Sequence, residues 1–164
     1  MVDLGSAFPQ EVYQTAAVTA ITGVKRPRLQ TWLERGWIQP SIQSGSGAGT
    51  RNIFSRNDLY IIGIFKLLTE TGIPRETVGD IIAELKGDIG FPLVDMEKEG
   101  YDIVKHTLFY CTKGENSRAI LLSGSDFLFG DTILSLGMNG YEYAFIFNIL
   151  PVITEIDKKI EAMK

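Results

Sequence analysis

Basic and amide side chains gather in one short segment of this 164-residue chain. The residues with this chemistry are Lys25, Arg26, Arg28, Gln30, Thr31 and Arg35. Arginine and lysine neutralise phosphates, and arginine and glutamine also pair bidentately with guanine and adenine edges in the major groove of DNA. The segment therefore has the side chains of a DNA-contacting surface.

Polar residues before and after this segment extend the set. Thr15 begins an alanine-rich stretch, and three further polar residues follow a glycine-rich loop. The DNA-contacting residues that we predict are Thr15, Lys25, Arg26, Arg28, Gln30, Thr31, Arg35, Arg51, Asn52 and Arg56.

Charge is distributed unevenly along the chain. Residues 20–56 carry six basic side chains and one acid, Glu34, whereas the whole chain has a formal net charge of −4. The rest of the chain is therefore acidic, which suits a protein that docks on DNA through one patch. A cluster of arginines can also be only a solvated helix face, so the interpretation depends on the elements that hold the cluster.

A short helix over residues 15–22 is predicted before the basic cluster. Thr15 can cap its first amides, and its apolar residues share one face. Gly23 follows where the chain must turn sharply, and glycine tolerates the positive φ that such a turn often needs. We interpret this element as a scaffold helix.

A second helix is predicted from Arg26 through Gly36. Pro27 lies near its first position, where the missing N–H has no cost, and Gly36 closes it. An apolar stripe packs inward and leaves the basic and amide side chains on the other side. The stripe consists of Leu29, Trp32 and Leu33.

The next segment has the pattern of a wing. Two short strands, residues 37–40 and 50–54, flank a loop of serine and glycine over residues 41–49. Ser55 and Asp58 then match a capping box that opens an amphipathic helix ending at Gly72. A further helix is predicted from Pro74.

These residues resemble the DNA-binding domain of MerR-type bacterial transcription regulators. The matching residues are Gly23-Val24, Leu29, Trp32 to Pro40, Gly49 to Arg51, Phe54-Ser55, Asp58-Leu59, Leu68 and Gly72-Ile73. The resemblance covers roughly residues 12–86 and rests on order and spacing. It implies a dimeric repressor or activator whose second helix enters the major groove. Arg51 would be the wing arginine, with Arg28, Thr31 and Arg35 on or beside the recognition face.

Two departures from the family pattern prevent the DNA site from being borrowed from relatives. Gln30 stands where the family usually has an arginine after the leucine of the second helix. Asn52 and Ile53 separate the wing arginine from the following aromatic residue, a spacing that resembles a variant branch of the family.

The second half is a different kind of sequence, and residues 86–92, with glycine, proline and charge, form its expected boundary. Residues 94–105 fit a helix that Gly100 weakens, and residues 127–136 fit a strand or a loop. The stretches with strand composition are Thr107–Thr112, Arg118–Leu122 and Tyr143–Ile149.

We therefore predict an α+β fold with two parts. Residues 1–86 form a winged helix-turn-helix DNA-binding domain, and residues 93–164 form a small antiparallel β-sheet region with a C-terminal amphipathic helix. Isoleucines and a methionine recur in that helix at alternating spacings of four and three, as in a heptad. They are Ile149, Ile153, Ile156, Ile160 and Met163.

This heptad stripe has two interpretations. It can cover the chain's own sheet, or it can pair with a second copy of the chain, since two heptads do not separate the two cases. The family resemblance favours dimerisation, because MerR-type proteins pair through elements C-terminal to the DNA-reading domain. A dimer would present two recognition helices to a palindromic site.

Other chemistries find little support in the sequence. Cys111 is the one cysteine, which removes an intrachain disulfide and a thiolate metal site, and no cofactor or metal is expected. His106 and Cys111 lack a third orienting group for a catalytic dyad, so we predict no enzyme. No apolar run of about 18 residues and no secretion signal occurs, so we expect a cytosolic protein without a membrane span.

The expected partners are double-stranded DNA and a second copy of the chain, with RNA polymerase as a further candidate. Aromatic residues are frequent in the second half, but strand aromatics are more often core, so a small-molecule effector is left open. Two alternatives remain for the function. One is an architectural or excisionase-like DNA-binding accessory protein, and the other is a protein-interaction module that reuses the winged fold.

Overall fold

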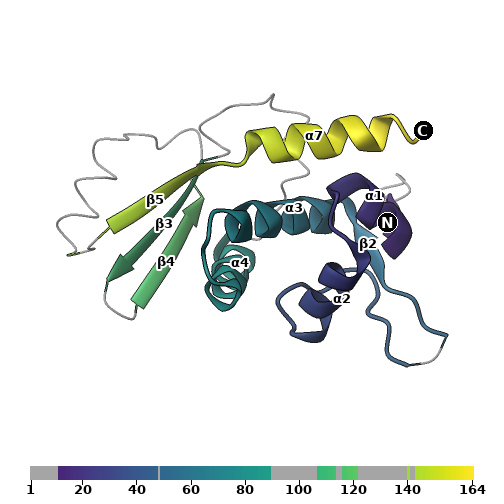
Figure 1. Cartoon of the computed structure of the whole chain (residues 1–164), viewed down its shortest axis with the longest axis horizontal. Helices are drawn as coiled ribbons and strands as arrows, with labels where there is room; N and C mark the ends of the chain where they lie inside the picture. The colour runs from purple at the N-terminus through teal and green to yellow at the C-terminus, as the bar shows by residue number, and fades with distance from the viewer. Residues whose placement is uncertain (1–10, 48, 90–106, 114–115, 122–139, 141–142) are drawn as a thin grey trace, which may run out of the picture.

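The computed structural model describes residues 11–47, 49–89, 107–113, 116–121, 140 and 143–164. Helices and two antiparallel sheets alternate along the chain, which confirms the predicted α+β class (Figure 1). The elements are β1 (Val12–Gln14), α1 (Thr15–Thr22), α2 (Arg26–Glu34), β2 (Ile53–Ser55), α3 (Arg56–Glu70), α4 (Arg75–Ile89), β3 (Thr107–Lys113), β4 (Asn116–Leu121), β5 (Tyr143–Asn148) and α7 (Leu150–Glu161).

The turn between α1 and α2 forms at the predicted glycine. Gly23 has a φ of +68°, and its N–H donates to the carbonyl of Thr19 over 3.0 Å, which closes α1. Glycine adopts this left-handed conformation without the steric penalty that a Cβ would add. The predicted cap at Thr15 is wrong, because the N-cap is Gln14 and it makes no capping side-chain bond.

The predicted strand over residues 37–40 is wrong. The N–H groups of Trp37 and Ile38 both donate to the carbonyl of Trp32, at 3.1 and 3.3 Å, so this segment closes the C-terminal end of α2. Unpaired carbonyls at a helix end attract such donors, and this competes with strand formation. The loop to β2 then extends away from the helices (Figure 1).

The strand β2 pairs on two sides. It runs antiparallel to β1, with Tyr13 opposite Phe54. On its other side Gln43 and Ile53 exchange both backbone hydrogen bonds, at 3.1 and 2.9 Å. This bridge joins the ends of the glycine-rich loop over residues 43–53.

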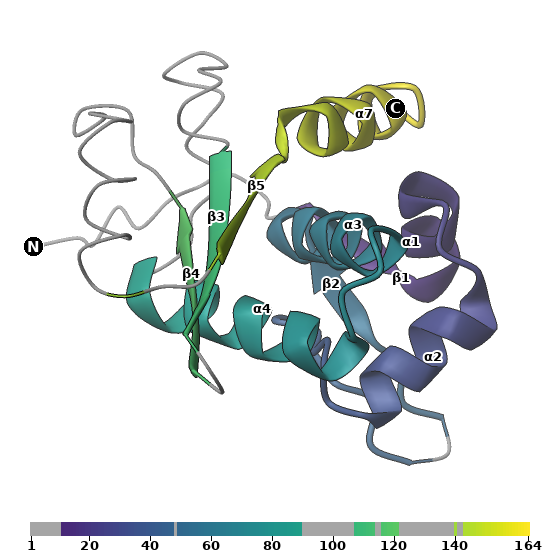
Figure 2. The same ribbon diagram turned by 60° about the vertical axis from the view of Figure 1, so that its left-hand side comes forward.

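Helix α3 forms the centre of the core. Every residue from Asp58 to Phe65 is buried, because α3 packs against α1, α4 and α7 at once. Figures 1 and 2 show α3 lying between α7 and α4. The predicted capping box at its start is confirmed, since Ser55 and Asp58 make both reciprocal bonds.

Helix α7 shares this core, although the sequence placed it in the second region. Its apolar stripe is buried against α3 and α1, which is packing within the chain. The expected dimer seam is therefore occupied by the chain's own helices, with Met163 alone 57 % exposed. The four residues that are 3 % exposed or less are Ile149, Ile153, Ile156 and Ile160.

The second sheet is antiparallel and contains the three predicted strand segments, in the order β4-β3-β5, an order that the sequence did not predict. Strand β4 contacts α4, and β5 leads through Ile149 directly into α7. The sheet is thus joined to the N-terminal helices by its continuation into α7 as well as by packing (Figure 2).

Several sequence predictions lie outside the described residues. These are the helix over residues 94–105, the ambiguous segment 127–136, His106, and the aromatic residues Tyr101, Phe127, Phe129 and Tyr141. Within the described ranges, no helix is long and apolar enough to cross a membrane.

Candidate nucleic-acid interface

The exposed face of α2 presents a row of three polar side chains. Arg26, Gln30 and Glu34 follow one another at four-residue spacing, which places them on one side of a helix. All three are exposed. The opposite side buries Leu29 and Trp32 in the core, so packing fixes the direction in which the row points.

This row forms one wall of a wide, open groove of about 1070 Å³. The other walls are the start of α1 and the loop over residues 38–52. The groove collects half of the predicted DNA-contacting residues from three separate segments. They are Thr15, Arg26, Gln30, Arg51 and Asn52.

The start of α1 also faces the groove. Thr15 and Ala16 line it, and no side chain caps the first amides of the helix. Free N–H groups at a helix N-terminus attract anions such as phosphates. The Arg51 guanidinium lies beside this end and donates to Gln14 Oε1 over 3.4 Å, so a cation and a helix N-terminus lie on the same side of the groove.

The base of the loop is fastened to the start of α3. Asp58 Oδ2 accepts from the Ser41 hydroxyl at 2.8 Å, from the Ser41 N–H at 2.9 Å and from the Ser55 N–H at 2.8 Å. A carboxylate with several donors holds the backbone firmly. Asp58 is 2 % exposed, so this anchor is part of the core.

Asn52 has a role inside the loop. Its Oδ1 accepts from the N–H of Gly45 over 2.7 Å, which ties the two sides of the loop together. The sequence predicted a DNA contact for Asn52. In the structure its side-chain carbonyl oxygen accepts a hydrogen bond within the loop.

Arg28 faces away from the groove. Its Nη2 donates to Thr69 Oγ1 at 3.0 Å, its Nη1 lies 3.7 Å from Glu70 Oε1, and its guanidinium lies 5.0 Å from the centre of the Trp32 ring. Residues two apart on a helix point to nearly opposite sides, so Arg28 cannot share the face of Arg26. It packs against the C-terminal end of α3.

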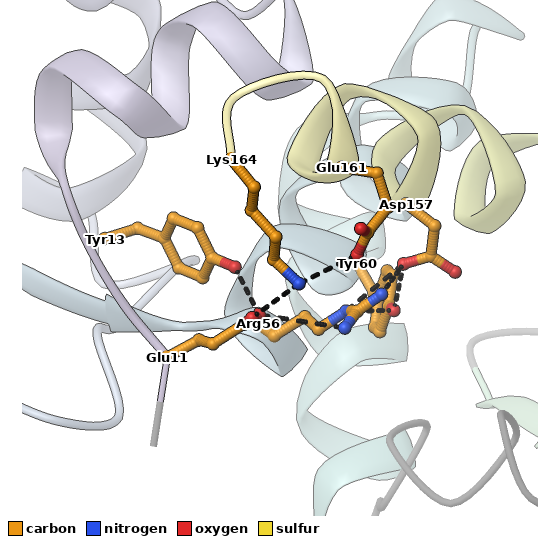
Figure 3. Close-up of polar contacts among 7 residues, drawn as sticks. All are labelled: Glu11, Tyr13, Arg56, Tyr60, Asp157, Glu161 and Lys164. Atoms are coloured by element: carbon orange, nitrogen blue, oxygen red, sulfur yellow. Dashed lines mark hydrogen bonds and ion pairs between the residues drawn. The ribbon is translucent and has the colours of Figure 1, made fainter. Parts of the chain in front are cut away.

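Arg56 is also engaged within the protein (Figure 3). Its Nη2 donates to Asp157 Oδ1 over 2.7 Å, and its Nε donates to the Tyr60 hydroxyl over 2.9 Å. The Tyr60 hydroxyl donates to the same Asp157 carboxylate. Burial and this carboxylate raise the pKa of Tyr60. The Arg56 side chain is 13 % exposed, and it binds α3 to α7.

Further polar contacts lie beside Arg56, at the carboxylate of Glu11. Glu11 accepts from the Tyr13 hydroxyl at 2.8 Å and from the Lys164 ammonium at 3.0 Å (Figure 3). These two groups lower the pKa of the Glu11 carboxyl, the tyrosine having the larger effect. Arg56 is therefore part of a cluster that joins the segment before β1, α3 and α7, and its predicted DNA contact stays a prediction.

The other predicted contacts lie on exposed positions outside the groove. Lys25 precedes α2, Arg35 follows it, and the Thr31 hydroxyl donates to the Pro27 carbonyl over 3.0 Å. Within the described residues, no group of histidine, cysteine, aspartate and glutamate could hold a metal ion.

A protein family matches the part of the chain that contains the groove. Residues 13–85 match the sequence model of the MerR HTH family regulatory proteins. These residues belong to the MerR HTH family. The resemblance predicted for residues 12–86 is confirmed.

Curated proteins with similar sequences carry the name of transcriptional regulators. The chain is 26 % identical over 128 residues to uncharacterized HTH-type transcriptional regulators of Mycobacterium bovis and of two strains of Mycobacterium tuberculosis. The alignment covers 76 % of this chain and 54 % of each relative. The chain thus spans about half the length of the curated relatives it matches.

Two polar residues of the groove that the sequence did not predict are Gln14 and Glu34. Gln14 was overlooked because it was not recognised as the residue before α1. Glu34 was overlooked because it is acidic, although its four-residue spacing from Gln30 already placed it on the same helix face.

Proposed function

We propose that this chain is a transcription regulator that binds duplex DNA sequence-specifically. In this proposal α2 enters the major groove and the loop over residues 38–52 holds the neighbouring backbone. The observation that supports it most is the gathering of Arg26, Gln30 and Arg51 in one groove beside the uncapped start of α1.

Each part of the groove fits one kind of DNA contact. Arg51 and the free amides of α1 suit phosphates, which position a protein on the duplex. Gln30 projects from the middle of α2, where its amide suits a base edge. Arg26 lies in the first turn of α2 and suits a phosphate or a guanine.

The names of the relatives support regulation as the purpose of binding, since each is an HTH-type transcriptional regulator. Arg51 beside the start of α1 argues against a module that only binds protein, because that function needs no cation beside a helix N-terminus. The second sheet argues against a minimal architectural protein, which needs little more than the reader.

Selection of bound duplexes from a random DNA library tests the proposal. We expect one sequence to be enriched and its affinity to fall steeply as salt is raised, because phosphate contacts release counterions. Salt-dependent binding without enrichment would favour the architectural alternative. Absence of DNA binding at low salt would favour the protein-interaction alternative.

We also propose that the regulator acts as a homodimer. Two copies would present two α2 helices to an inverted repeat. Because the inner stripe of α7 is buried within its own chain, the partner surface would lie elsewhere, and Ile156→Asp should unfold the chain instead of only separating subunits. Sedimentation equilibrium at micromolar concentration tests this, and a monomer mass with and without operator DNA would contradict it.

A further inference from the structure

Glu34 is an acid in a groove whose other charged residues, among those described, are Arg26 and Arg51. It was not among the predicted DNA contacts. A carboxylate there repels phosphates, so it weakens binding to DNA of any sequence. Its neighbour one turn earlier is Gln30, whose Nε2 donates to Glu34 Oε1 over 2.9 Å.

The chemistry of this bond decides how the Gln30 amide is turned. A carboxylate only accepts hydrogen bonds, so the atom of the amide that faces Glu34 must be the nitrogen. One N–H of Nε2 is used in this way. The carbonyl oxygen Oε1 and the second N–H of Gln30 remain for a partner in the groove. If residue 34 carried a neutral amide, the Gln30 amide could rotate by half a turn, and its NH₂ group and carbonyl oxygen would exchange places.

An acceptor beside a donor complements adenine. The major-groove edge of adenine offers the N6 amino donor beside the N7 acceptor, whereas guanine offers two acceptors, O6 and N7. One of the guanine acceptors would face either Gln30 Oε1 or the carboxylate of Glu34. The pair therefore matches adenine and opposes guanine.

We infer that Glu34 is a positioning residue that holds Gln30 in the orientation for adenine and disfavours guanine at the base pair that Gln30 faces. This inference rests on the proposed function, because it assigns a base preference to the same groove. Glu34 would lower the affinity for DNA of any sequence and raise the discrimination between adenine and guanine. Such a repulsive element among the groove's cations is a known way to gain specificity.

Selection from a random duplex library with wild type, two groove variants and one control variant tests this inference. Wild type should show adenine over guanine at one position of the site. Glu34→Gln is nearly isosteric and its amide both donates and accepts, so the preference at that position should fall about tenfold. Affinity for unrelated duplex should rise, because a negative charge is removed. Gln30→Ala should lose preference at the same position.

Glu155→Gln is the matched control, because Glu155 is exposed on α7 and pairs with Lys159. It should leave every base preference unchanged. The inference is overturned if Glu34→Gln keeps the wild-type preference, or if it weakens all positions alike, which would indicate a structural role. If wild type enriches no sequence, the proposed function fails first and the inference falls with it.

Discussion

The Arg56 guanidinium donates to the Asp157 carboxylate with 2.7 Å between Nη2 and Oδ1, across 101 positions of sequence. The two side chains are 13 % and 11 % exposed. The attraction between opposite charges is stronger when the pair is shielded from water, and removal of one member is costly because the other charge is then left without its counter-charge. This pair fixes α7 to the first turn of α3, next to Asp58, which anchors the loop over residues 38–52.

Asp157→Asn should lower the free energy of unfolding by about 2 kcal/mol, because it leaves the Arg56 charge without its closest carboxylate. Urea denaturation followed by circular dichroism measures the effect. Glu155→Gln removes an exposed pair with Lys159 on the same helix and should change stability by about 0.5 kcal/mol or less. Equal stabilities of the two variants would contradict a structural role for the cluster.

Gly63 allows α3 and α7 to approach closely. A Cβ at this position would lie 2.6 Å from Val152 Cγ1 and 2.8 Å from Ile156 Cδ1. Gly63→Ala should therefore destabilise the protein by about 1–3 kcal/mol through overpacking. Adding Val152→Ala should recover part of this loss, because it removes the nearest atom. A double variant less stable than the sum of the two single changes would refute the proposed contact.

Stability should depend on pH through Glu11. The pKa of its carboxyl is lowered in the folded protein by the Tyr13 hydroxyl and the Lys164 ammonium, below the ordinary value of 4.5. The ionised form thus stabilises the fold above pH 4.5, and this contribution is lost as the pH falls through the folded pKa. The stability difference between wild type and Glu11→Gln should shrink on acidification. A difference that grows below pH 4.5 would contradict this linkage.

Arg28→Ala should affect stability more than DNA recognition. It removes a hydrogen bond to Thr69 and a contact with the Trp32 ring, worth together about 1 kcal/mol. The salt dependence of DNA affinity should stay at the wild-type value, whereas Arg26→Ala should reduce its slope by about 1. Equal reductions in slope for the two variants would return Arg28 to the DNA-contacting face.

Local signals explain what could be predicted from the sequence. Gly23, Pro27 and Gly36 mark helix ends through their own backbone restrictions. The Ser55–Asp58 capping box spans three residues and needs no distant partner. The strands of the second sheet were found in the same way, from runs of apolar and β-branched residues bounded by turns.

Distant partners explain what could not be predicted. Arg28 and Arg56 have the side chains of DNA contacts. In the structure they donate hydrogen bonds to Thr69 and Asp157, which lie 41 and 101 positions away. The heptad spacing in α7 marks an apolar face but not which surface covers it. Strand β1 has three residues and forms because β2 pairs with it. Its own sequence is too short to show a strand pattern.

DNA binding through the groove is tested by the salt dependence of duplex affinity, measured for wild type and for Arg51→Ala. Lys158→Ala serves as the control, because it removes an exposed charge from α7, outside the groove. We expect a steep decrease in wild-type affinity with salt, a slope shallower by about 0.9 for Arg51→Ala, and an unchanged slope for Lys158→Ala. Wild-type affinity that is independent of salt, or identical slopes for the two variants, would contradict DNA binding through this groove.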